Sequence, residues 1–521
     1  MSTDNVKKSS LLASAGLVSG ATAFSRVFGL IREQTMAYFF GVSAATDAFV
    51  TAFRIPNLLR DLFAEGALSS AFVPVFKEKL VNESDREAFS LARTVVTAIL
   101  VVVGGIVLLG MVATPIIIYI SAKGFTADPA KFDLTVSLTR LMFVYLLLVS
   151  LSALVMGVLN SFGRFGIPAI APAVFNLGII LSVFVLYGLL EVPIYAMAIG
   201  VLVGGVGQLA VQLPPLLKIG FRYRPRFDFL DEGLKKVVRL FVPMVLGMSA
   251  GRVNIIVNTL LASFLMDGSI TYLNYSYRLM HFPLGVFAVA LGTVALPRAS
   301  ELAARGDMEE IGRTFSKALG LNLFLILPSA AFLAIVGPDI VALVYEWGAF
   351  SGTETANTAL ALLHYSYGLV GFAAVRVTVP IFYAIKDSKL PAKLSVISVA
   401  LNIALYFPLM KILDFAGLAA ATSIAGLANF GMLLYFLPSR NVPVAFGKLL
   451  LNFVRMALAA FLAVWAARFV PLDLAFIDSE VLRRALNVVF ILLASGLLYI
   501  VLCFMMRVRE VSVLKSRLFG G

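Results

Sequence analysis

Phe24–Phe76 reads FSRVFGLIREQTMAYFFGVSAATDAFVTAFRIPNLLRDLFAEGALSSAFVPVF. The stretch is apolar enough for two membrane-spanning helices and a following turn. It nevertheless carries eight charged residues: Arg26, Arg32, Glu33, Asp47, Arg54, Arg60, Asp61 and Glu65. A charged residue near the centre of a membrane helix costs at least about 2.5–3.5 kcal/mol on insertion scales. Folding alone does not account for this density of charge, so the stretch predicts that something polar is bound or moved here.

The composition places the whole chain in a membrane. Of its 521 residues, 60% are hydrophobic and 14% are charged, and the mean hydropathy is +0.96, whereas soluble domains average roughly 25% charged residues. One cysteine, Cys503, and two histidines, His281 and His364, exclude a disulfide framework and argue against a zinc site. We therefore expect an integral membrane protein with no metal or cofactor. The formal charge of +13 is then explained by membrane orientation rather than by a nucleic-acid partner.

Apolar segments long enough to cross about 30 Å of hydrocarbon predict the membrane spans. The chain has fourteen, at 13–39, 45–62, 89–120, 134–160, 168–190, 193–217, 238–265, 270–296, 314–336, 357–384, 391–412, 416–437, 447–470 and 483–506. The expected fold is an all-α integral membrane protein with 14 transmembrane helices.

Lys and Arg in the connections test this count, because short cytoplasmic loops are rich in both. They gather in every second connection: Lys77 to Arg93, Arg164, Lys218 to Arg239, Arg298 to Arg313, Lys386 to Lys393, Arg440 with Lys448, and the tail from Arg507. The alternate connections hold few or none. The alternation predicts an even number of spans with both termini in the cytoplasm.

The longest basic connection, Lys218–Arg239, reads KIGFRYRPRFDFLDEGLKKVVR and mixes cations with aromatic side chains. Such a mixture also occurs where proteins bind single-stranded nucleic acid. Between two membrane spans it is more typical of an amphipathic segment that contacts anionic lipid headgroups. We therefore expect contact with membrane phospholipids, no nucleic-acid partner, and a cytoplasmic linker at 218–237.

An internal repeat predicts two lobes on either side of this linker. TDAFVTAFRIPNLL aligns with ITYLNYSYRLMHFP, and MGVLNSFGRFGIPA aligns with VPIFYAIKDSKLPA at nearly the same spacing. The agreement favours two six-helix lobes as parallel pseudo-twofold repeats. The expected domains are the N-lobe at 1–217, the C-lobe at 238–440, and 441–521, which holds two extra helices and a cytoplasmic tail.

Parallel repeats place a central cavity between the lobes near the membrane midplane. Residues seven apart lie nearly on one helix face. Arg26 and Glu33 have this spacing, as do Asp47 and Arg54. These four residues are therefore expected to line the cavity rather than to face lipid.

Arginines outnumber the acids that lie deep within predicted spans: Arg26, Arg32, Arg54, Arg60, Arg252, Arg278 and Arg376 against Glu33 and Asp47, because no Asp or Glu lies deep within any span after Asp47. A net-cationic cavity favours an anionic substrate, because the guanidinium fork matches phosphate and carboxylate oxygens. The alternative is that these arginines pair with acids to hold helices together, or extend to the interface. The two acids are too few to pair with all of them.

Three stretches resemble the MurJ (MviN) family of bacterial lipid II flippases: FSRVFGLIREQ, ATDAFVTAFRIPNLLRDLFAEGALSSAFVPVF and YRLMHFPLGVFAVALGTVALPRAS. The resemblance covers essentially the whole chain. It implies the fold of the multidrug/oligosaccharidyl-lipid/polysaccharide (MOP) exporters, with a groove for the lipid tail between the last two helices. It also implies a bacterial inner membrane location and a role in peptidoglycan synthesis, cell-wall biogenesis and cell shape.

The resemblance also assigns roles to individual positions. Its substrate-binding arginines correspond to Arg26, Arg32, Arg60 and Arg278, and Arg54 and Arg376 occupy positions that are basic in relatives. The family aspartate corresponds to Asp47, and Glu65 lies in the FAEGA signature. Together with Glu33 and His281, these acids are candidates for coupling or for structural counter-charge.

Two departures limit what the resemblance implies. Some relatives have acidic residues close to the second-lobe arginine, where this chain has Tyr277 and His281. Relatives proposed to bind sodium use a second-lobe carboxylate, where this chain offers Asn258 and Asn402. The driving force is therefore open between the membrane potential, an ion at the first-lobe acids and proton coupling at His281.

The expected function is that of a monomeric flippase. It would move lipid II, the undecaprenyl-pyrophosphate-linked peptidoglycan precursor, from the inner to the outer leaflet by alternating access, with the cell-wall synthesis machinery as a further candidate partner. Alternatives are a flippase for another polyprenyl-pyrophosphate oligosaccharide and a drug or ion antiporter of the same fold, although an antiporter for cations would favour acids. A glycosyltransferase would need acidic catalytic or metal-binding groups in sizeable loops. The outer loops Ser121–Asp133 and Gly337–Thr355 lack paired carboxylates of that kind, so we expect no enzyme.

Overall fold

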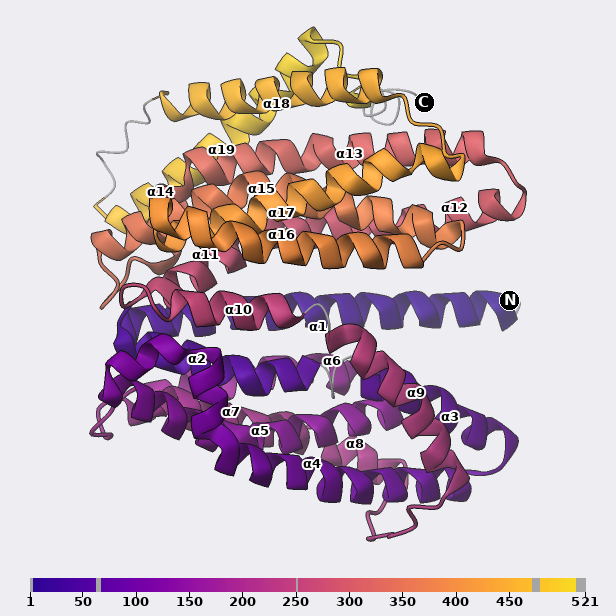
Figure 1. Cartoon of the computed structure of the whole chain (residues 1–521). Coiled ribbons are helices and arrows are strands. Elements are labelled where there is room, and N and C mark those ends of the chain that lie inside the picture. Colours follow the sequence, from indigo (N-terminus) through magenta and orange to yellow (C-terminus); the bar gives the residue numbers. More distant parts are fainter. Residues whose placement is uncertain (1–2, 62–66, 250–251, 471–477, 512–521) are drawn as a thin grey trace. The chain divides into compact units, whose positions relative to one another are not determined.

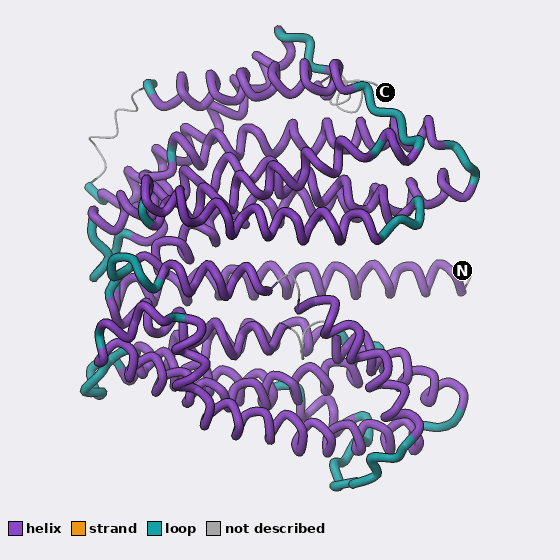
Figure 2. Tube along the Cα trace, in the orientation of Figure 1, coloured by secondary structure: helices purple, strands orange, loops and turns teal. Residues whose placement is uncertain are grey.

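The computed structural model describes four ranges of the chain: 3–61, 67–249, 252–470 and 478–511. Every regular element in these ranges is a helix, which confirms the all-α fold class (Figure 1; Figure 2). The chain divides into two compact units, Met1–Ile270 and Thr271–Gly521.

The first unit is a bundle whose helices are α1 (Thr3–Phe40), α2 (Ala44–Arg60), α3 (Ser69–Asn82), α4 (Asp85–Ser121), the 3-10 helix η2 (Lys123–Ala127), α5 (Pro129–Ser161), α6 (Gly166–Leu186), α7 (Tyr195–Ala210), α8 (Leu213–Lys218), α9 (Glu232–Ser249) and α10 (Val253–Ala262). Within it α1 packs on α6, and α2 packs on α5.

A capping box starts α2: Ser43 Oγ accepts a hydrogen bond from the backbone N–H of Thr46, and Thr46 Oγ1 accepts one from the backbone N–H of Ser43. This start places Asp47 in the first turn of α2.

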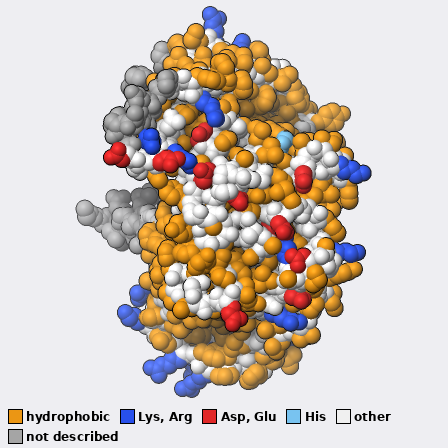
Figure 3. Space-filling view, turned by 90° about the vertical axis from the view of Figure 1, so that its left-hand side faces the viewer, with side chains coloured by type: hydrophobic (Ala, Val, Ile, Leu, Met, Phe, Trp, Pro, Cys, Tyr) orange, Lys and Arg blue, Asp and Glu red, His pale blue; other side chains and the backbone are white. Residues whose placement is uncertain are grey.

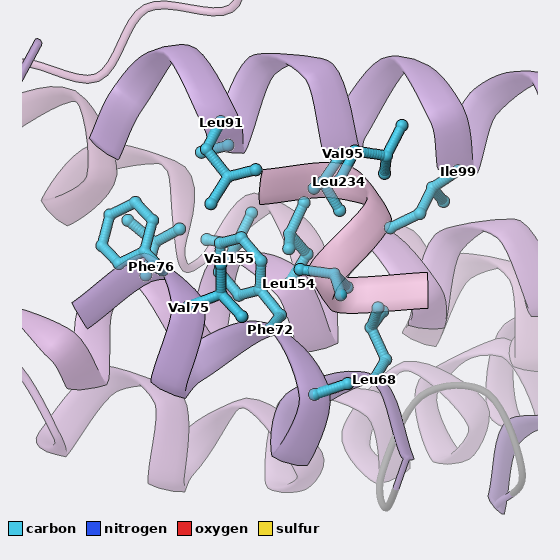
Figure 4. Close-up of a cluster of buried hydrophobic side chains, with 14 of the residues drawn as sticks. Leu68, Phe72, Val75, Phe76, Leu91, Val95, Ile99, Leu154, Val155 and Leu234 are labelled. Atoms are coloured by element: carbon cyan, nitrogen blue, oxygen red, sulfur yellow. The ribbon is translucent and has the colours of Figure 1, made fainter. Parts of the chain in front are cut away.

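A buried apolar cluster joins α3, α4, α5 and α9 (Figure 4). Phe72 and Phe76 of α3 meet Leu91 of α4, and Leu234 brings α9 into the same cluster. All four side chains are less than 9% exposed, so α9 is fixed against α3 and α4 by burial of apolar surface.

The second unit holds α11 (Ser269–Pro283), the π-helical turn η4 (Leu284–Ala288), α12 (Val289–Ala304), α13 (Met308–Ile335), α14 (Gly337–Tyr345), α15 (Gly352–Ala384), α16 (Lys389–Leu413), α17 (Phe415–Phe436), the 3-10 turn η5 (Pro438–Arg440), α18 (Phe446–Arg468) and α19 (Glu480–Met505). Pro283 ends α11 just before the π-helical turn, as expected where a proline interrupts the backbone ladder. The outer pair α18 and α19 meets α13 in a separate small cluster that includes Val464 and Ile491.

Ten helical segments in the described ranges are long and apolar enough to cross a membrane: Asp85–Ser121, Pro129–Ser161, Gly166–Leu186, Tyr195–Lys218, Met308–Ile335, Gly352–Ala384, Lys389–Leu413, Phe415–Phe436, Phe446–Arg468 and Glu480–Met505. The four other predicted spans are also largely helical, but they are short, interrupted or charged. The multi-pass architecture is confirmed, and the count of 14 spans stays a prediction.

The four segments that fall outside this set carry most of the candidate site. They are the predicted spans at 13–39, 45–62, 238–265 and 270–296, which form α1, α2, α9 with α10, and α11 with α12. Charge lowers their mean hydropathy, and α2 and α10 are short helices. The same features that weaken the membrane signal therefore mark the helices of the candidate site.

The compact units divide after α10, whereas the expected lobe boundary was the linker at 218–237. Contacts of α10 explain this difference, because Thr259 bonds to α2 and Ser263 accepts a hydrogen bond from the N–H of Gly124 in η2. In this structure the first helix pair after the linker belongs to the first unit. The domain boundaries and the internal repeat themselves stay predictions.

Large hydrophobic side chains reach the surface over much of the molecule (Figure 3). Leu109 and Val112 of α4 are 71% and 79% exposed, and Leu493 of α19 is 67% exposed. Apolar exposure on this scale is typical of surfaces solvated by lipid rather than by water.

Candidate functional site

A buried ion pair joins the first turns of α2 and α5. Lys131 Nζ lies 3.1 Å from Asp47 Oδ2 and 2.7 Å from Asp267 Oδ1. The same Asp47 oxygen accepts a 2.7 Å hydrogen bond from the backbone N–H of Gly268. The side chains of Lys131 and Asp47 are only 6% and 2% exposed. Asp47 therefore ties α2 both to α5 and to the turn that follows α10.

The last turns of α2 contact α10 through Arg54 and Asp61. Arg54 donates a hydrogen bond to Thr259 Oγ1. Asp61, directly after α2, lies 3.1 Å from Arg60 and 3.1 Å from Arg252. One carboxylate is thus shared by two guanidinium groups at this end of α2.

The arginines of α1 differ in how they are neutralised. Arg32 pairs with its neighbour Glu33 at 2.5 Å, with side chains 12% and 6% exposed. Arg26 is exposed, and it forms no ion pair with any residue in the described part of the chain. Arg26 is therefore available to a ligand oxygen without first breaking an internal pair.

The second unit brings Arg278 and His281 of α11 together with Arg376 of α15. Both arginines are exposed, and both lie within electrostatic reach of His281. Nδ1 of His281 lies 3.0 Å from the carbonyl oxygen of Tyr277, so Nδ1 carries the hydrogen. This group of the second unit is cationic, and its role in substrate binding stays a prediction.

The first-unit group also has an excess of positive charge. Its members away from the Lys131 pair are Arg26, Arg32, Arg54, Arg60 and Arg252; Glu33 pairs with Arg32, and Asp61 pairs with Arg60 and Arg252. Partly buried guanidinium groups are weakly hydrated and hold several donors in a fixed geometry. Such an array can bind phosphate oxygens with forked hydrogen bonds.

Metal coordination finds no support among the described residues, where no group of three or more His, Cys, Asp or Glu side chains is placed to hold an ion. At one of the two positions where relatives proposed to bind sodium have a carboxylate, the amide of Asn402 donates to Tyr406 at 3.0 Å. The expectation of no metal or cofactor stays a prediction.

Sequence reasoning missed Lys131 and Asp267, which it placed in outer connections. One local signal was available. Lys131 follows Pro129 in the first turn of a helix, where the helix dipole disfavours a cation unless carboxylates compensate. Asp267 carried no such signal, because its role depends on the position of α10.

The remaining predicted site residue, Glu65, lies outside the described residues. The roles assigned to the arginines, to Glu33 and Asp47 as counter-charges, and to His281 stay predictions, although the structure groups them by unit as described above.

Comparison with known proteins decides the family. The model of the family "Lipid II flippase MurJ" matches residues 36–507. The chain belongs to the MurJ family. The lipid II flippase MurJ of Burkholderia cenocepacia is 35% identical over 432 residues, with 82% of this chain and 83% of that protein covered. The probable lipid II flippase MurJ of Vibrio cholerae is 34% identical, with 81% and 82% covered.

Solved structures agree with the MurJ assignment. A lipid II flippase MurJ in an inward closed conformation superposes with a TM-score of 0.76 at 26% identity, covering 94% of this chain and 99% of that one. An inward-facing multidrug resistance MATE transporter of the MOP superfamily gives a TM-score of 0.62 at 13% identity, covering 80% and 94%. The second likeness concerns the fold alone and confirms the expected MOP architecture.

Proposed function

We propose that this chain flips lipid II across the bacterial inner membrane, as the names of its MurJ relatives state for them. The observation that carries the proposal is the gathering of arginines on α1, α2 and the start of α10, where Arg26 is exposed and forms no ion pair with a described residue, and where Asp61 is shared by Arg60 and Arg252. A pyrophosphate-linked lipid supplies the missing negative charge. A transporter for cations would need the opposite balance.

Phosphate recognition falls to the exposed arginines first. Arg26 meets the pyrophosphate without losing an internal ion pair, and Arg32 shares Glu33 with it. Arg278 and Arg376 supply donors from the second unit. Substrate binding can drive transport only if its free energy differs between the conformations of the protein.

Alternating access also requires a closure that opens. We assign one to Asp47, Lys131 and Gly268, because Asp47 joins α2, α5 and the turn after α10. The charge distribution of the loops places this end outside the cell. Release to the outer leaflet then separates Asp47 from Gly268. It exposes the charged groups of Asp47 and Lys131 to water, which lowers the penalty of their desolvation.

The energy source follows from which charges move. The membrane potential acts on every displaced charge with about 2.3 kcal/mol per 100 mV. Glu33 and Asp47 remain the acids at which an ion would bind, and His281 is the site for proton coupling. The protein acts as a monomer with both termini in the cytoplasm, with the α18–α19 pair holding the lipid tail and the cell-wall synthesis machinery as a further partner.

The test is translocation of fluorescent lipid II in proteoliposomes with imposed potential, sodium and proton gradients. R26A and R278A should each abolish translocation, and R32A should reduce it strongly. R305A is the matched control, because Arg305 is an exposed arginine paired with Glu301 in a loop. Wild-type rates in R26A, R32A and R278A together would refute the phosphate-binding role.

A further inference from the structure

The segment between α8 and α9, residues 219–231, is fastened along one face of α4, and we call it the α8–α9 strap. Phe221 packs edge-on against Phe89, with 5.7 Å between ring centroids. The carbonyl oxygen of Arg222 accepts a 2.9 Å hydrogen bond from Arg93 Nε. Phe89 and Arg93 are one helical turn apart, so the strap follows a single stripe of α4.

Thr97, one turn further along the same stripe, is the third fastening point. Its Oγ1 accepts a 3.1 Å hydrogen bond from the backbone N–H of Arg226 and lies 3.2 Å from the hydroxyl of Tyr223. Thr97 is 2% exposed. The strap is therefore an ordered part of its unit rather than a loose loop.

Thr97 also marks the depth of the strap in the membrane. From residue 98 to the end of α4 at Ser121 there is no charged residue, whereas Arg93 precedes Thr97 by one turn. At about 1.5 Å per residue, this uncharged run covers about 36 Å, slightly more than the roughly 30 Å of a hydrocarbon core. The fastening points of the strap therefore lie at the boundary between hydrocarbon and headgroups.

Apolar side chains of the strap are turned outward at this depth. Phe227, Phe229 and Leu230 are 69%, 45% and 77% exposed. The strap loops out past α4, away from the other helices of its unit (Figure 1). Large exposed apolar groups held at an interface by ordered backbone are typical of membrane anchors.

Cations of the strap accompany these side chains. Arg222 and Arg224 are exposed, and neither forms an ion pair with a residue that the structure describes. Arg226 is different, because it pairs with Asp228 at 3.0 Å. Two guanidinium groups therefore remain for phosphate oxygens next to the exposed aromatic rings.

We propose that the α8–α9 strap is an interfacial anchor that binds anionic phospholipid. Phe227, Phe229 and Leu230 enter the headgroup region, while Arg222 and Arg224 bind lipid phosphate. The loop charges place the strap on the cytoplasmic side, whose leaflet carries anionic lipid. The anchor fixes the depth of the α4 and α9 ends while other helices move, and it does not depend on which substrate the protein carries.

Tryptophan quenching by brominated lipid tests the proposal in the full-length protein. In a Trp347→Phe, Trp465→Phe background, Phe227→Trp is reconstituted in vesicles with brominated acyl chains on either phosphatidylglycerol or phosphatidylcholine at equal mole fraction. Val81→Trp is the control for water and Leu109→Trp the control for lipid, because both native side chains are 71% exposed. Phe229→Trp is a second probe should the first variant fail to fold.

The strap probe should be quenched clearly more than Val81→Trp and less than Leu109→Trp. Phosphatidylglycerol should quench it at least about twofold more than phosphatidylcholine, and Arg222→Gln with Arg224→Gln should remove this preference. Quenching no greater than that of Val81→Trp overturns the anchor and leaves a soluble partner as the occupant. Equal quenching by the two lipids overturns the anionic specificity.

Discussion

Lys131 and Asp47 are 84 residues apart in the chain, yet their charged atoms lie 3.1 Å apart with almost no exposure to solvent. The ammonium group of Lys131 also lies 4.2 Å from the centre of the Phe125 ring. A buried ion pair is a weak source of net stability, but removing one partner leaves an uncompensated charge. The pair is therefore a sensitive point at which to perturb the proposed closure.

Lys131→Met should destabilise the protein by about 3 kcal/mol, because it leaves the Asp47 carboxylate buried without its ion-pair partner. This value is at the lower end of the range for a broken buried pair, because Asp47 still accepts the hydrogen bond from the N–H of Gly268. Asp47→Asn in the same chain should relieve part of this loss, since it removes the orphaned charge. Unfolding in detergent, followed by helical circular dichroism, measures both. Lys235→Met is the control, because its pair with Glu232 is exposed, and exposed pairs contribute little to stability. Strict additivity of the two buried substitutions would contradict the pairing.

The contact between η2 and α10 predicts a second effect. A Cβ at Gly124 would lie 2.1 Å from the carbonyl oxygen of Ser263, a backbone atom that cannot turn away. Gly124→Ala should therefore push α10 off its unit, at a cost of about 1–3 kcal/mol.

Labelling of a cysteine at a buried position of α10 measures this displacement. Leu261 is 9% exposed, so Leu261→Cys, in a Cys503→Ser background, should react slowly with a maleimide. Adding Gly124→Ala should raise the rate. Gly188→Ala is the control, because nothing lies within 4 Å of its added methyl group. Equal labelling in the two glycine variants would show that α10 does not depend on this contact.

Hydropathy and charge were sufficient to predict the helices, and they also singled out the arginines of the candidate site, whose roles stay predictions. An apolar run indicates a membrane span independently of how the helices pack. An arginine such as Arg26 within such a run stands out, because inserting its charge into the membrane costs free energy. The pairing of Lys131 with Asp47 could not be read in this way. It depends on how α2 and α5 pack, and the first turns of two helices carry no sequence mark of being adjacent.

The position of α10 shows the same limit. The basic linker at 218–237 suggested that the next helix opens the second lobe, because linkers usually separate domains. Hydrogen bonds from Arg54 to Thr259 and from Gly124 to Ser263 instead attach α10 to the first unit. These contacts depend on one conformation of the chain, and a sequence pattern does not specify a conformation.

A pH-dependent prediction concerns the connection between α15 and α16. Arg440 Nε donates a 2.7 Å hydrogen bond to Asp387 Oδ2, and this bond holds the pKa of Asp387 below its ordinary value of 3.8. A lowered folded-state pKa contributes stability above the unfolded value, which is lost as the pH falls through the folded value. Asp387→Asn should therefore lower the melting temperature by the same small amount at pH 5 and pH 8.

Below about pH 3.8 the difference from wild type should shrink, because the unfolded carboxyl group is then protonated. Melting temperatures at pH 8, 5 and 3.5 measure this. The effect corresponds to at most about 1 kcal/mol, since the Arg440 side chain is 42% exposed and solvent screens the pair. Arg440→Gln should reproduce the profile, and a difference that disappeared between pH 8 and pH 5 would exclude Asp387 as its source.

The end of α19 gives the last prediction. After a left-handed turn at Arg507, where φ is 56°, the chain folds back and buries Glu510 to 7% exposure. Glu510 Oε2 accepts a 2.7 Å hydrogen bond from Asn452 Nδ2 of α18. Its other oxygen occupies the space above Gly320 of α13, where a Cβ would lie 2.2 Å away. Glu510 therefore fastens the end of α19 to both neighbouring helices.

This arrangement makes the effects of two substitutions non-additive. Glu510→Ala should cost about 1–3 kcal/mol, because it leaves the Asn452 amide without its acceptor, and Gly320→Ala should cost a similar amount by displacing the carboxylate. The double variant should be close to Glu510→Ala alone, because the methyl group then fills the vacated space. Gly431→Ala in α17, with nothing within 4 Å of its added methyl group, should be neutral or slightly stabilising, since alanine favours a helix. If the two losses simply added in detergent unfolding, the carboxylate and Gly320 would not share the same space.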